Sequence, residues 1–200
     1  LDKSLINSEI KKFFSMKIGP TWPRVLLDAK KRIAWDAAIV SGITFERKIS
    51  IGGGVDFLWN KSSEEEKVGN NKYRIESEEK TFMFPISGYF SISPIPDIIV
   101  NPSFSGQIGL NTMYFSHKEN KKENSIPDTL LNDENGWYMG FFWKIGLDAI
   151  FNIGSNTGLF AGVDYQWTKP KKLDSSEDES YFYRRDMSGI GIRMGFRTFF

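Results

Sequence analysis

The chain has 200 residues, a formal net charge of +1 and no cysteine, and aromatic residues make up 15% of it. The small net charge gives no field strong enough to indicate a nucleic-acid partner, and the lack of cysteine excludes disulfides and thiolate metal sites. The length suits a single domain, and no run of about eighteen apolar residues is present to form a transmembrane helix.

Apolar and polar residues alternate along most of the chain, which is typical of strands with one apolar face. We expect residues 1–12 to form an N-terminal extension and residues 13–200 to form one β domain. The alternation predicts eight strands, over residues 13–21, 33–46, 48–60, 80–92, 103–116, 136–150, 158–167 and from about 181 to the end.

The links between these strands alternate in length. Residues 21–32, 61–79, 117–134 and 168–180 are long and charged and are expected to be flexible loops, whereas 46–48, 93–97 and 152–157 are short turns. All the long links would lie at one end of the strands and all the short ones at the other. This arrangement predicts an all-β fold, an eight-stranded antiparallel up-and-down transmembrane barrel.

The polar face of the strands decides which side is turned inward. It is rich in small residues, as in Ser50, Gly52 and Gly54, whereas a water-facing outer surface would carry long Lys, Glu and Thr side chains. Small residues suit a narrow interior, so the apolar face is expected to point outward, toward lipid. The less favoured alternative is a soluble lipocalin-like carrier with its apolar side chains inside.

Most of the tryptophans occur where a strand meets a long link. Amphipathic indole rings prefer the boundary between lipid and water, so a ring of interface residues is expected at that end of the barrel. Its members are Trp22, Trp35, Trp59, Trp137 and Trp167.

The last twelve residues, GIGIRMGFRTFF, alternate strictly and end on an aromatic residue. With the strand number and the unequal links, this segment makes residues 13–200 resemble the small eight-stranded outer-membrane barrels of the OmpA and OmpX type, although Thr198 departs from the apolar pattern. The resemblance implies that the barrel-assembly machinery of Gram-negative bacteria recognises the terminal strand through Ile190, Ile192, Met194, Phe196 and Phe200.

The inward face would also collect charged side chains. In so narrow a lumen they must be paired or hydrated, and the simplest interpretation is a polar network that fills the interior. A gate whose ion pairs rearrange to pass ions is the alternative. The network would contain Lys17, Asp36, Asp56, Lys144, Asp148, Asp164, Arg193 and Arg197, with Asp164 and Arg193 placed to pair across neighbouring strands.

Catalytic chemistry has one candidate base. His117 is the only histidine, but its neighbour Ser116 would point to the opposite face of a regular strand, so the two cannot form a nucleophile and base pair. Acidic and basic stretches in the long links would be solvated, or would contact lipopolysaccharide phosphates directly or through divalent cations. No motif for a resident metal or phosphate site is present, so no cofactor is expected.

The predicted protein is therefore a monomeric, integral outer-membrane barrel with a structural or surface-interaction role. Its expected partners are outer-membrane lipid and lipopolysaccharide, with at most a low-conductance pore; the sequence does not identify an extracellular partner. The alternative function is an outer-membrane enzyme that modifies lipid A or phospholipid, with His117 as its base.

Overall fold

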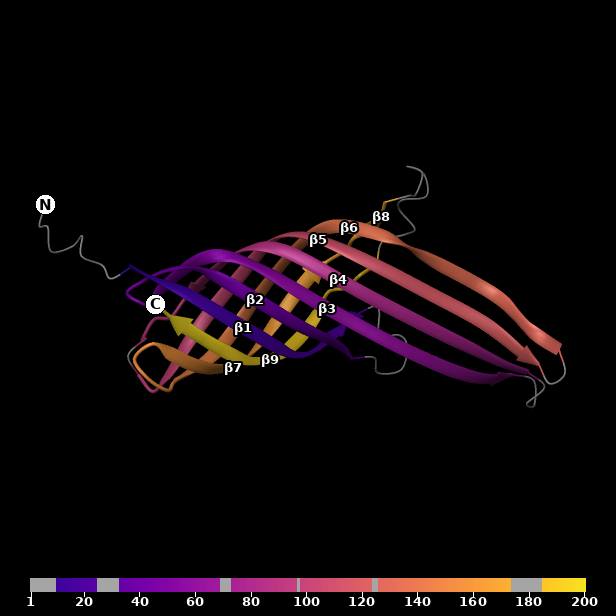
Figure 1. Ribbon diagram of the computed structural model, residues 1–200, viewed down its shortest axis with the longest axis horizontal. Helices are drawn as coiled ribbons and strands as arrows, with labels where there is room; N and C mark the ends of the chain where they lie inside the picture. The colour runs from indigo at the N-terminus through magenta and orange to yellow at the C-terminus, as the bar shows by residue number, and fades with distance from the viewer. Residues whose placement is uncertain (1–9, 25–32, 69–72, 97, 124–125, 174–184) are drawn as a thin grey trace, which may run out of the picture.

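Eight antiparallel strands close into one ring in the computed structural model, which describes residues 10–24, 33–68, 73–96, 98–123, 126–173 and 185–200 (Figure 1). Consecutive strands pair, and β9 returns to pair with β1. A ninth, two-residue strand, β8, lies outside the ring and pairs with β6. The strands are β1 (Ile10–Pro23), β2 (Ala34–Phe45), β3 (Ile49–Val68), β4 (Tyr73–Ile92), β5 (Val100–Glu123), β6 (Ile126–Asn152), β7 (Thr157–Thr168), β8 (Lys171–Lys172) and β9 (Gly189–Phe199).

The ring confirms the predicted eight-stranded barrel, with some differences at the strand ends. β1 begins at Ile10, three residues before the expected start, and β9 begins at Gly189 and not near Tyr181. Residues 1–9, 25–32 and 174–184 lie outside the described part of the chain, so most of the predicted extension and parts of two predicted loops are not described. No helix among the described residues is long and apolar enough to cross a membrane.

The apolar side chains lie on the outside of the barrel. In β9, Ile190, Ile192 and Met194 are each about half exposed or more, while Gly191 and Arg193 between them are buried. The same alternation runs through β2, where Ile39 and Ile43 are exposed and Val40 is buried. An apolar outer surface of this extent is tolerated only by lipid, so the arrangement of a soluble carrier, with apolar side chains inside, is excluded.

Inward-facing glycines let neighbouring strands curve tightly. A Cβ atom added to Gly195 would lie 1.9 Å from the carbonyl oxygen of Met16, and one added to Gly52 would lie 2.0 Å from that of Ser41. No real side chain fits at such distances, so these positions require glycine. The glycine-rich face is therefore the concave one.

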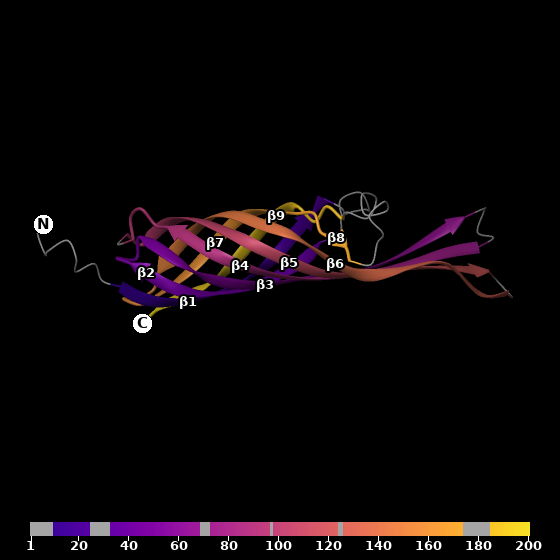
Figure 2. The same cartoon turned by 90° about the horizontal axis from the view of Figure 1, so that it is seen from above.

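Four strands continue far beyond the ring. β3, β4, β5 and β6 have 20, 20, 24 and 27 residues, whereas β2 and β7 have 12 each. Figures 1 and 2 show these four strands running on together as a sheet that leaves the barrel at the end opposite both termini. We call this part, residues 61–68, 73–80, 116–123 and 126–136, the projecting sheet.

The projecting sheet corrects the prediction of flexible loops at 61–79 and 117–134. The described parts of these segments pair as strands, with Lys61 opposite Lys80 and His117 opposite Glu134, and the β5–β6 pairing shifts register between Glu119 and Glu123. Most of their residues are polar, with apolar ones such as Leu130 and Leu131 not in alternation, so they lack the pattern by which strands were identified. Cross-strand ion pairs hold them instead: Lys61 with Glu78, Arg74 with Glu65, Lys122 with Glu76 and Lys118 with Asp133.

The opposite end of the barrel carries the short turns. The turn between β2 and β3, residues 46–48, has Glu46 and Arg47 at φ values of 49° and 55°, in the left-handed region that non-glycine residues seldom adopt. The side chain of Arg47 crosses to the turn between β6 and β7, where it donates to the carbonyl oxygen of Ser155. We call this the short-turn end.

Candidate functional site in the lumen and at its mouth

A cluster of five charged side chains lies across the middle of the lumen. Arg193 of β9 is 1% exposed; its Nη2 lies 2.5 Å from Asp36 of β2 and its Nε lies 2.5 Å from Asp164 of β7. Lys144 of β6 lies 3.1 Å from Asp36 and also contacts Asp56 of β3. Five strands therefore contribute to one buried ion-pair network.

This network brings together five of the eight charged residues predicted for the lumen, including Asp164 and Arg193. Three carboxylates share two cations, and each cation contacts at least two carboxylates. Removing one partner from such a buried cluster leaves an uncompensated charge, so the members hold one another in place. The cluster therefore occupies the lumen at this level and links strands on opposite sides of the barrel.

The three other predicted lumen charges lie nearer the short-turn end. Lys17, Asp148 and Arg197 are all buried, but none makes an ion pair with a described residue. Lys17 and Arg197 instead contact the ring of Tyr89, in β4. The sequence did not single out Tyr89 because an inward tyrosine resembles any other lumen-filling residue.

An apolar layer covers the charged cluster on the side of the projecting sheet. Leu58 lies two residues beyond Asp56 in β3, and Met83 and Met113 stand in one row with it across β4 and β5. All three are fully buried inside the ring. They pack in one group with Ala34, Phe115, Tyr138 and Met187. The described part of the lumen thus contains a charged layer followed, toward the projecting sheet, by an apolar layer.

Residues 185–188, which precede β9, pack against this layer at the mouth of the barrel. Their backbone is tied to the end of β7, because the amide of Met187 donates to the carbonyl of Thr168 and that of Arg185 donates to Pro170. The guanidinium of Arg185 stacks 3.5 Å from the centre of the Phe115 ring and lies 3.0 Å from Glu134. We call Phe115, Glu134, Tyr138 and Arg185 the mouth cluster.

The mouth cluster lowers the pKa of one of its own side chains, the carboxyl group of Glu134. Burial raises the pKa of Glu134, but the charge of Arg185 and hydrogen bonds from Tyr138 and Arg185 outweigh it, so the pKa lies below its ordinary value of 4.5. Glu134 is therefore ionised at neutral pH and anchors Arg185 over the mouth. Sequence reasoning missed Arg185 and Glu134 because both had been assigned to other elements, a strand and a flexible loop.

His117 and Ser116 are consecutive residues of β5 in regular pairing with both neighbouring strands. His117 stands opposite Glu79 and Glu134 on the face that continues the lumen, and Ser116 stands opposite Lys80 and Asn135 on the other face. The imidazole stacks on Phe115, at 6.5 Å between ring centres. This geometry does not support a Ser–His catalytic pair, and the described residues include no group of His, Asp and Glu side chains that could hold a metal ion.

The five predicted interface tryptophans all lie on the outer side of the barrel. Trp35, Trp59 and Trp137 belong to one row of directly paired residues that crosses β2 to β6 through Phe82 and Tyr114. Trp167 pairs with Trp143, which was not among the predicted members, and their rings stack at 6.4 Å. Trp137 lies six residues farther along β6, toward the projecting sheet.

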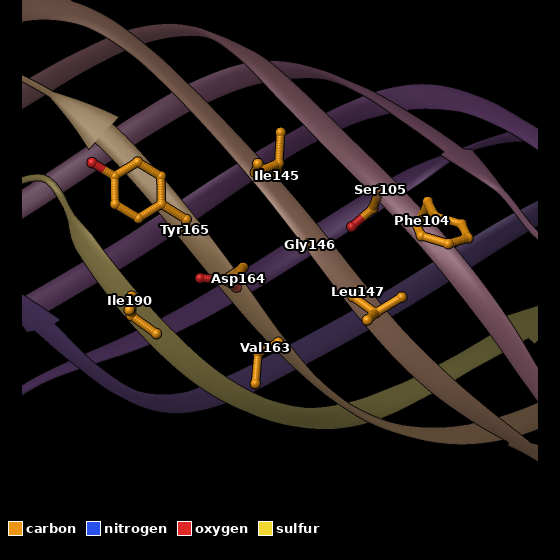
Figure 3. Close-up of a pocket in the computed structure, with 9 residues that line it drawn as sticks. All are labelled: Phe104, Ser105, Ile145, Gly146, Leu147, Val163, Asp164, Tyr165 and Ile190. Atoms are coloured by element: carbon orange, nitrogen blue, oxygen red, sulfur yellow. The ribbon is translucent and has the colours of Figure 1, made fainter.

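A groove of about 530 Å³ lies on the outer wall across β5, β6, β7 and β9. Figure 3 shows Ile145, Leu147, Val163 and Ile190 around Gly146, with Phe104 and Tyr165 at opposite ends. The carboxylate of Asp164 points to the other side of the wall, where it pairs with Arg193 in the lumen. The groove therefore belongs to the apolar outer surface and is separate from the lumen.

No protein-family model and no curated protein sequence matches the chain. Among solved structures, it is similar to Neisserial surface protein A, with 10% identity, 96% of this chain and 97% of that chain covered, and a TM-score of 0.48. It is also similar to Ail, the attachment invasion locus protein of Yersinia pestis (14% identity, 96% and 97% covered, TM-score 0.42). A third is a major outer membrane protein from Thermus thermophilus (13%, 94% and 99%, TM-score 0.46).

The fold assignment itself rests on the closed register of the strands and on the outward apolar face. By these two features the chain is an eight-stranded antiparallel transmembrane β-barrel.

Proposed function

We propose that the protein is an integral outer-membrane barrel of a Gram-negative envelope that does not conduct and that presents its projecting sheet to the cell surface. The observation that carries this proposal is the continuation of four strands beyond the ring, at the end opposite the short turns. In barrels of this kind the longer connections face outward from the cell and the short turns face the periplasm.

The filled lumen supports a role other than transport. A buried five-charge cluster, an apolar layer and the mouth cluster follow one another along the axis, and each involves side chains from several strands. A solute would have to displace all three. The projecting sheet would then serve to contact other molecules at the cell surface.

Lipopolysaccharide is the partner that the outer face of the projecting sheet favours. Lys61, Lys80, Arg74, Lys118 and Lys122 lie on that face, each paired with a glutamate or, for Lys118, with Asp133. Ammonium and guanidinium groups bind phosphate, and a basic surface beside the membrane favours anionic headgroups.

A trimmed variant tests this proposal. Because Lys61 pairs with Lys80 and His117 with Glu134, residues 62–79 and 118–133 can each be replaced by an Asn-Gly turn without changing the barrel register. We expect the trimmed barrel to keep the gel-mobility shift that folded membrane barrels show on boiling, and to lose binding to beads coated with lipopolysaccharide.

The matched control keeps the sheet and removes charge. Lys61→Gln with Lys80→Gln and Lys118→Gln should weaken bead binding, whereas Glu65→Gln with Glu76→Gln should not. Full binding by a trimmed variant that still shows the gel shift would contradict the proposed role of the projecting sheet.

A further inference from the structure

Two buried cations converge in the lumen near the short-turn end. Lys17 of β1 is 7% exposed and Arg197 of β9 is 2% exposed. Lys17 Nζ lies 5.6 Å from the centre of the Tyr89 ring, and Arg197 Nη2 lies 2.5 Å from the hydroxyl oxygen of Tyr89. Two like charges thus meet at one aromatic side chain.

Neither cation has a carboxylate partner among the described residues. Lys17 contacts the rings of Tyr89 and Phe160, and Arg197 contacts those of Phe13 and Tyr89. Lys144 and Arg193, in contrast, take up three of the four lumen carboxylates. Burying a charge is costly unless it is paired, so this half of the lumen needs negative charge.

The fourth carboxylate, that of Asp148, is turned toward β7. Its Oδ1 occupies the space over Gly162, 2.1 Å from the position a Cβ would take there, and Gly162 pairs with Arg193 in the neighbouring strand. Asp148 therefore leans along the wall, beside β7, and no ion pair joins it to Lys17 or Arg197.

Unpartnered hydrogen-bond donors lie on the strands that carry Lys17, Arg197 and Tyr89. Arg197 Nε and the hydroxyl groups of Ser15 and Ser91 are buried and have no hydrogen-bond partner. Ser15 pairs directly with Arg197 across β1 and β9, and Ser91 lies two residues from Tyr89 on the same face of β4. Ammonium, guanidinium and hydroxyl groups can all donate to one anion.

From this geometry we propose that the lumen binds a small inorganic monovalent anion between Lys17 and Arg197, for which chloride is the natural probe. The rings of Phe13, Tyr89 and Phe160 contact the two cations, and an eight-stranded interior has room only for a compact ligand. The ion neutralises the charge that Asp148 leaves unpaired and ties β1, β4 and β9 together. The site depends on the barrel fold and not on the proposed surface contact.

Chloride-dependent stability tests the site in solution. A ligand that binds only the folded barrel raises its unfolding temperature. The midpoint of the heat-dependent gel shift should therefore be higher by several degrees in sodium chloride than in sodium gluconate at equal ionic strength. Arg197→Gln and Lys17→Met should abolish that difference, whereas Lys48→Gln, in the exposed turn at the same end, should keep it.

Diffraction from crystals grown in sodium bromide locates the ion. An anomalous peak between Lys17 Nζ and the Arg197 guanidinium is expected. Equal midpoints for the unaltered protein in the two salts would overturn the proposal, as would an empty difference map with Asp148 paired to Lys17. If the substituted chains fail to show a gel shift at all, the two measurements on the unaltered protein still decide the question, and neither depends on lipopolysaccharide binding.

Discussion

Arg193 is the residue that joins the largest number of strands inside the barrel. Its guanidinium contacts carboxylates from β2, β3 and β7, and it is almost fully buried. Arg193→Gln would leave three carboxylates facing Lys144 alone. We expect it to destabilise the barrel by roughly 3–5 kcal/mol, since breaking a buried pair leaves an uncompensated charge.

The measurement for this prediction is urea unfolding in lipid vesicles, followed by tryptophan fluorescence. Lys48→Gln serves as the control, because Lys48 pairs with Glu46 on the exposed surface and such a pair contributes about 1 kcal/mol or less. Equal losses for the two variants would show that the lumen network is not a stabilising plug.

The carboxyl group of Glu134 should make the stability of the folded protein depend on pH. The pKa of its carboxyl is lowered in the folded protein, so its stabilising contribution is present in full above the ordinary value of 4.5 and is lost as the pH falls through the folded pKa. Stability should therefore differ between the unaltered protein and Glu134→Gln at pH 7 and converge toward pH 3. Thermal unfolding followed over this pH range checks it, and a difference that persists undiminished at pH 3 would contradict the assignment.

At the scale of the strand, glycine sets the curvature of the barrel. Gly195→Val would push a side chain into the carbonyl of Met16, at 1.9 Å from Cβ, and into the ring of Phe160. The cost should exceed the roughly 1–3 kcal/mol typical of overpacking, because backbone cannot move aside. We expect no heat-dependent gel shift for this variant, whereas Gly154→Ala, with nothing within 4 Å of its added Cβ, should fold normally.

The strands of the projecting sheet show why apolar–polar alternation in the sequence does not identify every strand. In β3 the alternation of Val55, Phe57 and Trp59 ends at Asn60, although the strand continues to Val68. Beyond the membrane both faces of the sheet meet water, so no apolar stripe is required and ion pairs such as that of Lys61 with Glu78 take its place. The available signal was the cross-strand complementarity of Lys and Glu, which becomes visible only once the register is known.

For the molecule as a whole, the layered lumen predicts a closed barrel. The charged cluster, the apolar group around Met83 and Met113, and Arg185 at the mouth follow one another along the lumen, and an ion would have to pass all three. Planar bilayers containing the protein should stay at baseline conductance. Steady single-channel currents from protein that shows the gel shift would mean that the layers move apart and that the gate interpretation holds.

The sequence by itself determined the barrel, because its alternation has a period of two and the polar face is rich in glycine and serine, which suit a narrow interior better than a water-facing outer surface. It also placed a set of charged residues on the inward side, because the alternation within one strand decides which of its side chains point inward. These residues are Asp36, Asp56, Lys144, Asp164 and Arg193. Only the tertiary structure decided which of these charges meet, because that depends on the register between strands far apart in the chain. In this register Lys17 and Arg197 lie beside Tyr89 without a carboxylate partner among the described residues. Arg185 lies over Phe115, and two charged links form strands of the projecting sheet.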